Sequence, residues 1–232
     1  MRKEPFVTGN FYHVYNRGVD KRTIFQNDRD YRRFLVGLYL FDDAALHDYD
    51  LTRMDLRSLA SYQSRKLLVD VIHWCLMPNH FHFLVRQRRD NGTSFFMHRL
   101  GTSYTKYFNQ KYERSGRLLE GPFKAKPVKT DEYFSHLAAY IPLNALDLYQ
   151  PGWKDDGIRH SRIAGAKTFL RRYPWTSFGS YFGQEIVTGL VARDIFLETF
   201  GGSLREYEKI IDSFIIGGIP PKYEAKLRSY EA

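Results

Sequence analysis

The segment from residue 67 to residue 87 constrains the fold more than any other part of this chain. Its first ten residues, LLVDVIHWCL, are mostly aliphatic and β-branched, and they predict a strand over 67–76. Met77-Pro78-Asn79 predicts a short turn. The alternating run HFHFLV then predicts a second strand that ends near Gln87. The two strands form a hairpin, with the phenylalanines on one face and the two histidines on the other.

Sequence patterns predict five more elements in the first 150 residues. In chain order they are a strand over 11–19, a helix over 28–43, a helix from Thr93 or Ser94 to about Tyr112, an irregular strand over 117–129, and a helix from Thr130 or Asp131 to about 149. The order with the hairpin is β–α–β–β–α–β–α. It predicts an α+β fold, in which a ferredoxin-like antiparallel sheet carries helices on one face.

Gly152 and the Asp155-Asp156-Gly157 cluster indicate a boundary near residue 150. We therefore expect one domain over 1–150 and a C-terminal extension over 151–232. The extension is predicted to be mainly helical, with a short helix at 161–172. Its aromatic side chains suit a plain packing module.

Composition excludes several classes of protein. Apolar residues make up 43% of the chain, which is enough for a core, yet no apolar run reaches the length of a membrane span. The polar start MRKEPFVTGN lacks the apolar segment of a signal peptide. The single cysteine, Cys75, excludes an internal disulfide and a cysteine-based zinc site. We expect a cytoplasmic protein without a membrane partner.

Positive charge is concentrated in one stretch of a chain whose net charge is +9. Residues 99–129 hold eight basic residues and two acidic ones, interleaved with tyrosines and phenylalanines. Such a mixture suits a nucleic-acid backbone and unstacked bases. A solvated helix face with ordinary core aromatics has the same composition, and the pattern does not choose between the two.

The two histidines of the hairpin form a candidate metal site. His80 and His82 are two residues apart on a strand, so they point to the same face about 7 Å apart. They are equally compatible with ordinary hydrogen bonding. A third ligand would come from a helix over the sheet, and the helix near 131–149 offers His136, Tyr140 and Asn144, which share one helix face at a spacing of four. Core packing of Tyr140 and a helix-end role for Asn144 are the alternative.

Five motifs in this order resemble those of the HUH tyrosine transposases, which act on single-stranded DNA. They are FYHVYNRG, MPNHFHFLV, YFNQKYERSGRLLEGPFKAKPV, YIPLN and YPWTSFGSYFG, and they extend over about residues 10–185. Within this superfamily the chain is most similar to the REP-associated tyrosine transposases, which are relatives of the transposases of small insertion sequences.

The resemblance implies a role for each matching residue. His80 and His82 fall on the metal-binding histidines, Tyr140 on the nucleophile, and Asn144 on the residue that completes the metal site. The implied cofactor is Mg²⁺ or Mn²⁺, while Zn²⁺, Ni²⁺ and Co²⁺ suit the same imidazoles in vitro. The implied reaction cleaves single-stranded hairpin DNA through a covalent 5′-phosphotyrosine and then joins strands.

The chain departs from the family pattern at two positions. Ala145 follows Asn144 where the family commonly has proline, and Pro142 stands two residues after Tyr140. Pro142 removes the hydrogen bond to the Ala138 carbonyl, so we expect a bend or an interruption there. Tyr104 and Tyr107 are rival nucleophiles by residue type. His136, one turn before Tyr140, is either a proton acceptor or an ordinary surface histidine.

The resemblance also implies single-stranded or hairpin DNA as the partner, and a location on the nucleoid when bound. With such a partner, the aromatic extension over 151–232 is either a clamp for the hairpin or a plain packing module. The residues expected to contact this DNA are Arg17, Arg114, Arg117, Lys124 and Lys126. Monomer and homodimer are both open, as is the choice between a mobile and a domesticated enzyme. A DNA-hairpin-binding protein without catalysis and a zinc-dependent hydrolase are the alternative functions.

Overall fold

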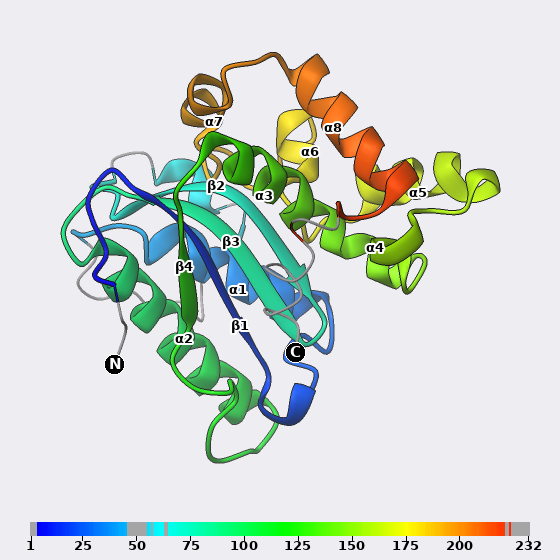
Figure 1. Ribbon diagram of the computed structural model, residues 1–232. Helices are drawn as coiled ribbons and strands as arrows, with labels where there is room; N and C mark the ends of the chain where they lie inside the picture. The colour runs from blue at the N-terminus through cyan, green and yellow to red at the C-terminus, as the bar shows by residue number, and fades with distance from the viewer. Residues whose placement is uncertain (1–3, 46–54, 57, 63–64, 221–222, 224–232) are drawn as a thin grey trace.

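The computed structural model describes residues 4–45, 55–56, 58–62, 65–220 and 223 of the chain (Figure 1). The strands are β1 (Phe11–Arg17), β2 (Val69–Met77), β3 (His80–Gln87) and β4 (Lys124–Val128). The first three α-helices are α1 (Asp28–Leu40), α2 (Gly92–Lys111) and α3 (Asp131–Leu143). Short 3₁₀ helices are η1 (Val19–Lys21), η2 (Ser58–Ser61), η3 (Asn144–Leu148) and η4 (His160–Arg162).

The four strands form one antiparallel sheet in the order β2-β3-β1-β4. This order, with β1–α1–β2 and β3–α2–β4 as the two repeating units, is the ferredoxin-like arrangement predicted from the sequence. The hairpin prediction is also confirmed, because β2 and β3 pair directly from Met77 and His80 onward. The α+β fold class is thus confirmed.

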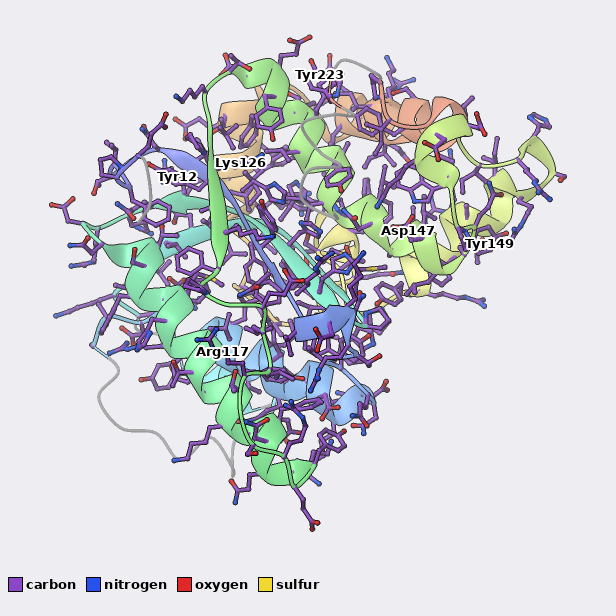
Figure 2. The ribbon with its side chains drawn as sticks, turned by 60° about the horizontal axis from the view of Figure 1, so that its bottom comes forward. Tyr12, Arg117, Lys126, Asp147, Tyr149 and Tyr223 are labelled. Atoms are coloured by element: carbon purple, nitrogen blue, oxygen red, sulfur yellow. The ribbon has the colours of Figure 1, made fainter. Side chains whose placement is uncertain are left out.

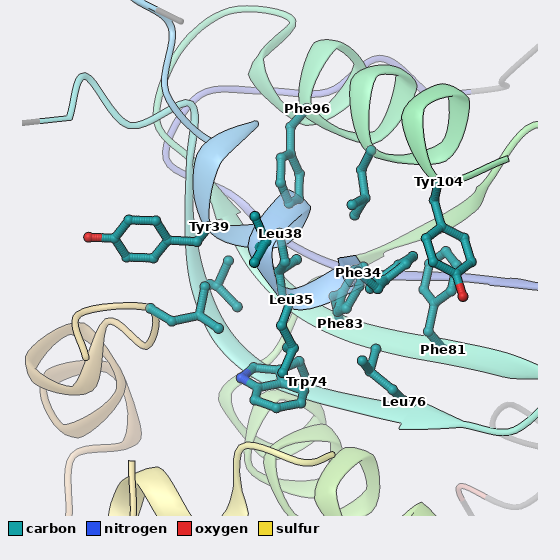
Figure 3. Packing of buried hydrophobic residues seen from close by; sticks show 14 of the residues in the cluster. Phe34, Leu35, Leu38, Tyr39, Trp74, Leu76, Phe81, Phe83, Phe96 and Tyr104 are labelled. Atoms are coloured by element: carbon teal, nitrogen blue, oxygen red, sulfur yellow. The ribbon is translucent and has the colours of Figure 1, made fainter. Parts of the chain in front are cut away.

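Side-chain alternation gives the sheet two different faces. Phe81 and Phe83 of β3 lie on the face that packs against α1 and α2, in a core that includes Phe34, Trp74 and Tyr104 (Figure 3). Leu84 of β3 belongs instead to the core on the other face. The phenylalanines and the histidines of β3 therefore lie on opposite faces, as predicted.

The sequence patterns predict that all helices lie on one face of the sheet. This part of the prediction is wrong. Helices α1 and α2 cover one face, but α3 packs on the opposite face, where Leu137, Ala138 and Ile141 share a buried cluster with Ile72 and Leu84. The reason is the apolar side of α3, which matches the second face of a central sheet that is apolar on both sides.

The C-terminal extension covers the outer side of α3 (Figure 1). It is mainly helical, as predicted, with α4 (Trp153–Asp156), α5 (Ile163–Arg172), α6 (Phe178–Tyr181), α7 (Arg193–Phe200) and α8 (Leu204–Gly217). Its backbone also runs along β2. Ser177 N donates to Trp74 O at 2.9 Å, Leu76 N donates to Trp175 O at 2.9 Å, and Ala192 N donates to Val71 O at 2.9 Å. The extension and α3 therefore share one core.

Helix α3 begins where predicted and passes through its internal proline. The Thr130 side chain caps it by accepting a hydrogen bond from Tyr133 N at 3.2 Å. Pro142 deprives the Ala138 carbonyl of its helical donor, and the Tyr207 hydroxyl of α8 donates to that carbonyl at 2.7 Å instead. The α-helix ends one residue after Pro142, and η3 continues the chain as a tighter turn.

Acid should destabilise this fold through His73, which is fully buried on β2 against Tyr181, Phe196 and Tyr207. Burial lowers the pKa of His73 from 6.5 to about 3. Between these values the unfolded chain binds a proton that the folded chain rejects, so stability falls as the pH falls. The free energy of unfolding at pH 5 should be about 2 kcal/mol lower than at pH 7 because of His73. Urea titrations at the two pH values measure it.

The matched control for this prediction is His73→Phe, which keeps an aromatic ring at the position but cannot titrate. In that variant, the part of the stability loss between pH 7 and pH 5 that is due to His73 should disappear. An unchanged difference in the free energy of unfolding between pH 7 and pH 5 would contradict the assignment.

Among the described residues no helix has the length and hydropathy needed to cross a membrane.

Candidate active site

The neighbouring strands β3, β1 and β4 place histidine, tyrosine and basic side chains next to one another on the sheet face that α3 covers. His80 of β3 lies opposite Arg17 of β1, and His82 lies opposite Tyr15. The next strand, β4, places Lys124 opposite Tyr15. Directly opposed residues of antiparallel strands share a face, so the two imidazoles and these cationic side chains lie on the same side of the sheet.

A pocket of about 120 Å³ opens beside the two histidines. Basic side chains dominate its rim, and two carboxylates moderate their charge. Its lining consists of Tyr15, Asn16, Arg17, Lys21, Asn79, His80, His82, Glu120, Lys124 and Asp147. Such a rim suits an anionic ligand such as phosphate. Figure 2 shows Asp147 on the segment that follows α3.

Each histidine of the pair has its Nδ1 atom engaged by a neighbour. His80 Nδ1 lies 2.7 Å from Asn79 Oδ1, an amide oxygen that can only accept, so this nitrogen carries the proton. His82 Nδ1 lies 2.9 Å from Nε2 of His13 on β1. Burial, followed by His80, His13 and Lys154, holds the pKa of His82 well below its ordinary value. His82 is therefore a neutral imidazole near pH 7, which is the form that binds metals.

Helix α3 brings Tyr140 to this pair of histidines. The ring centroids of Tyr140 and His82 are 6.0 Å apart in an edge-on arrangement. The Tyr140 side chain is buried at 1% exposure and does not line the pocket. The phenol ring thus lies close to the imidazole of His82 but is covered by the surrounding chain.

Asn144 is fully buried one turn after Tyr140, and its amide is already engaged. Its Nδ2 donates to the Tyr140 carbonyl at 2.9 Å and lies 3.3 Å from the Ile141 carbonyl. Its Oδ1 accepts from the ammonium of Lys154 at 3.1 Å. The helix register places Asn144 beside Tyr140, while the amide oxygen that would bind a metal faces an ammonium.

Lys154 is the contribution of the extension to this site. Its ammonium lies 2.6 Å from a carboxylate oxygen of Asp147 and 5.5 Å from the centre of the Tyr140 ring. The side chain is only 8% exposed, so the ion pair with the Asp147 carboxylate compensates a buried charge. One positive charge is thereby fixed next to the tyrosine.

The two histidines fit a divalent cation better than the rest of the predicted ligand set does. The buried Nε2 of His82 has no hydrogen-bond partner among the described residues, and Nδ1 of both rings is engaged elsewhere. Two Nε2 atoms are therefore suited to a shared ion. Within the described residues no three His, Cys, Asp or Glu side chains are grouped to hold a metal.

The rival tyrosines lie on the other side of the sheet. Tyr104 of α2 is buried in the core beneath α1 (Figure 3), and its hydroxyl donates to Ile24 O at 2.5 Å. The Tyr107 hydroxyl donates to Asp30 Oδ1 at 2.9 Å. His136 is half-buried between Phe214 and Tyr223 of the extension, outside the pocket. The structure therefore brings none of the three to His80 and His82.

The basic residues expected to contact DNA fall into different surroundings. Arg17 lines the pocket and pairs with Glu120, to which Lys124 also lies close at 3.7 Å. Arg114 holds the loop after α2 through Asn109 Oδ1 at 2.6 Å. Arg117 is exposed, and Lys126 is half-buried on β4 (Figure 2). These placements leave the DNA contacts a prediction.

Sequence reasoning did not assign His13, Asp147 or Lys154 to the site. His13 shares the parity of Tyr15 and Arg17 in FYHVYNRG, so its face could be predicted, but its closeness to His82 depends on strand register. Lys154 lies ten residues beyond Asn144 and reaches the site only because the chain turns back at Gly152, where φ is +82°.

Comparison with known families gives one match. Residues 44–143 are similar to the family described as IS200-like transposases. The match covers less than half of the 232 residues of the chain. Transposases of this family act in DNA transposition, and the matched residues include His80, His82 and Tyr140. The match ends one residue before Asn144.

Two solved structures are similar to this chain. One is described as a REP-associated tyrosine transposase bound to a REP hairpin, with a TM-score of 0.47 and 10% identity over 79% of this chain and 86% of that chain. The other is tRNA(His) guanylyltransferase from Saccharomyces cerevisiae, with a TM-score of 0.35 and 9% identity over 96% of this chain and 83% of that chain. No curated protein sequence matches significantly.

Proposed function

We propose that this protein cleaves single-stranded DNA beside a hairpin and rejoins it through a covalent link to Tyr140. The observation that carries the proposal is the position of Tyr140 on α3, with its ring 6.0 Å from His82 in a site rimmed by cationic side chains. The tyrosine oxygen forms a bond to phosphorus, and the bond from phosphorus to the 3′ oxygen breaks. The products are a 5′-phosphotyrosine and a free 3′-hydroxyl.

His80 and His82 would hold a divalent cation, Mg²⁺ or Mn²⁺, through their Nε2 atoms. Such an ion polarises a phosphate oxygen and stabilises the charge that develops there. The chain itself supplies three further elements of the reaction. Arg17 and Lys124 at the pocket rim attract the DNA backbone, Lys154 fixes a positive charge beside the nucleophile, and the α3–sheet packing orients the phenol.

Movement of the chain over Tyr140 is a requirement of this proposal. Tyr140 is 1% exposed, and Asn144 and Lys154 close the site on one side. Insertion of a phosphate would compete with Asp147 for the Lys154 ammonium, which is one of the contacts between the extension and η3. We therefore place the opening motion between η3 and α4, where the chain carries the glycine turn at Gly152.

A second hollow of about 640 Å³ extends the binding surface on the other face of the sheet. It lies between α2 and the segment 117–123, and Lys106 and Arg117 flank an apolar floor that includes Phe81 and Phe123. Asn16 lines both this hollow and the pocket at the histidines. A single strand leaving the catalytic pocket could place unpaired bases here, with its phosphates at the basic rim.

A hairpin-binding protein without catalysis is the second candidate. The specific observation in its favour is the closed arrangement, in which Tyr140 is buried and Asn144 Oδ1 accepts from Lys154. The two candidates differ in one measurement. The protein is incubated with single-stranded hairpin DNA and Mn²⁺ and run on a denaturing gel, where the enzyme gives a covalent adduct. If binding is seen but no adduct forms with a range of hairpins, the second candidate is correct.

Charge removal at the rim should weaken DNA binding in a salt-dependent way. Replacing Lys124 or Arg117 with alanine should reduce the slope of log affinity against log salt by about 0.7 for each phosphate that the protein no longer neutralises. Fluorescence anisotropy with single-stranded hairpin DNA measures the slope. Lys209→Ala on α8 is the matched control, because Lys209 is exposed but lies outside both hollows. Equal slopes for all variants would exclude a role for Lys124 and Arg117 in binding the DNA backbone.

A further inference from the structure

His13 is a fully buried side chain that the proposed reaction does not use. It lies in the middle of β1, opposite Leu84 of β3, on the face that carries His82. Its ring is stacked near that of His82, with centroids 5.1 Å apart and an interplanar angle of 23°. The His13 Nε2 atom lies 2.9 Å from His82 Nδ1, which is a good hydrogen-bond distance.

Both rings of this pair are almost inaccessible to solvent, at 0% and 1% exposure, and burial favours the neutral imidazole. Burial, aided by the positive charge of Lys126 opposite His13 on β4, lowers the pKa of His13 to about 3. The pKa of His82 is lowered as well. A neutral imidazole has one N–H and one lone pair, so only one of the two rings donates in the bond between them.

The direction of that bond decides whether His82 can bind a cation. If His82 Nδ1 donates to His13, His82 Nε2 has a lone pair. If His13 donates, His82 Nε2 carries a hydrogen and has no lone pair for a cation. The neighbouring His80 has the corresponding arrangement already fixed, since Asn79 Oδ1 can only accept from its Nδ1 at 2.7 Å.

We infer that His13 is a positioning residue, whose Nε2 accepts the Nδ1 proton of His82 and so holds Nε2 of His82 in the form that binds a divalent cation. The inference rests on the proposed function for the presence of that cation. Outer partners of this kind orient metal-binding histidines, and their loss typically lowers metal affinity about 10–100-fold. His13 supplies to His82 what Asn79 supplies to His80.

The first experiment needs no variant. In wild-type protein with ¹⁵N-labelled histidines at pH 8 and no metal, two-bond ¹H–¹⁵N correlation spectra report which nitrogen of His82 carries the proton. The expected result is protonated Nδ1 and unprotonated Nε2. A His82 ring protonated on Nε2 would overturn the inference directly, whatever the catalytic activity of the protein.

The second experiment compares His13→Gln with His13→Leu. Glutamine offers an oxygen near the position of Nε2 and can accept the proton, whereas leucine has similar bulk and cannot. Mn²⁺ affinity is measured by electron paramagnetic resonance, and folding by circular dichroism. We expect near wild-type affinity for the glutamine variant and a loss of about 10–100-fold for the leucine variant. Equal affinities of a folded leucine variant and wild type would overturn the inference.

The two proposals fail in different ways. Wild-type protein that binds no Mn²⁺ would contradict the metal part of the proposed function, while the tautomer of His82 in the metal-free spectrum would still decide the role of His13. Conversely, wild-type protein that binds Mn²⁺ and forms the DNA adduct, but has His82 protonated on Nε2 without metal, would retain the proposed function and refute the role of His13.

Discussion

Replacing Tyr140 with phenylalanine should abolish covalent attachment of the protein to single-stranded hairpin DNA. The change removes only the phenolic oxygen, while the ring keeps its packing beside His82 and in the core under the extension. Loss of a nucleophile lowers the rate by about a thousandfold or more. DNA binding should stay close to wild type, so the effect on the reaction is read from the adduct band on a denaturing gel.

Tyr104→Phe and Tyr107→Phe are the matched controls for this prediction. Both hydroxyls hydrogen-bond on the opposite side of the sheet, to Ile24 O and Asp30 Oδ1, so their loss lowers stability by about 1 kcal/mol each without touching the site. Both variants should still form the adduct. An adduct that persists in Tyr140→Phe, or that disappears in either control, would identify a different nucleophile.

Removing residues 151–232 should leave residues 1–150 unable to fold cooperatively. Helix α3 buries its outer side against the extension, where Trp153, Ile211 and Phe214 are nearly inaccessible to solvent. Each such side chain stabilises by about 1.5–3 kcal/mol through burial. Three of them alone approach the total stability of a typical domain, which is about 5–15 kcal/mol.

A hydrogen bond adds to this dependence. The Ala138 carbonyl, left without a helical donor by Pro142, accepts from Tyr207 in the intact chain and would lose that donor in the fragment. Thermal melts by circular dichroism and size-exclusion chromatography measure the outcome. The full-length chain is the control. A cooperative melt of the 1–150 fragment near the wild-type temperature would establish it as an independent domain.

Local patterns predicted most of the sheet and the side of it on which the candidate site lies. Strict alternation in HFHFLV was enough to put His80 and His82 opposite Phe81 and Phe83, because period-two patterns depend on nothing outside the strand. The spacing of Tyr140 and Asn144 was enough to put them on one helix face. The family resemblance then assigned roles, which the adduct and metal-binding measurements test.

Those local patterns do not predict contacts between residues that are far apart in the sequence. The bond between His13 and His82 joins residues 69 positions apart and requires the register of β1 against β3. The contact of Lys154 with Asn144 depends on a turn that the sequence indicated only as a boundary. The placement of α3 across the sheet from α1 and α2 depends on the second apolar face of the sheet, against which α3 packs its apolar side. Tertiary packing decided all three features.

The two edge strands of the sheet each carry features that oppose pairing with another chain. On the outer side of β2, residues Trp175 to Ser177 already occupy the backbone groups near Trp74 and Leu76. Strand β4 carries Pro127, which has no backbone N–H, together with Lys124 and Lys126. Exposed edges without such protection promote aggregation and intermolecular sheets. Two copies of this protein would therefore associate through helices or loops, and a continuous sheet across a dimer is disfavoured.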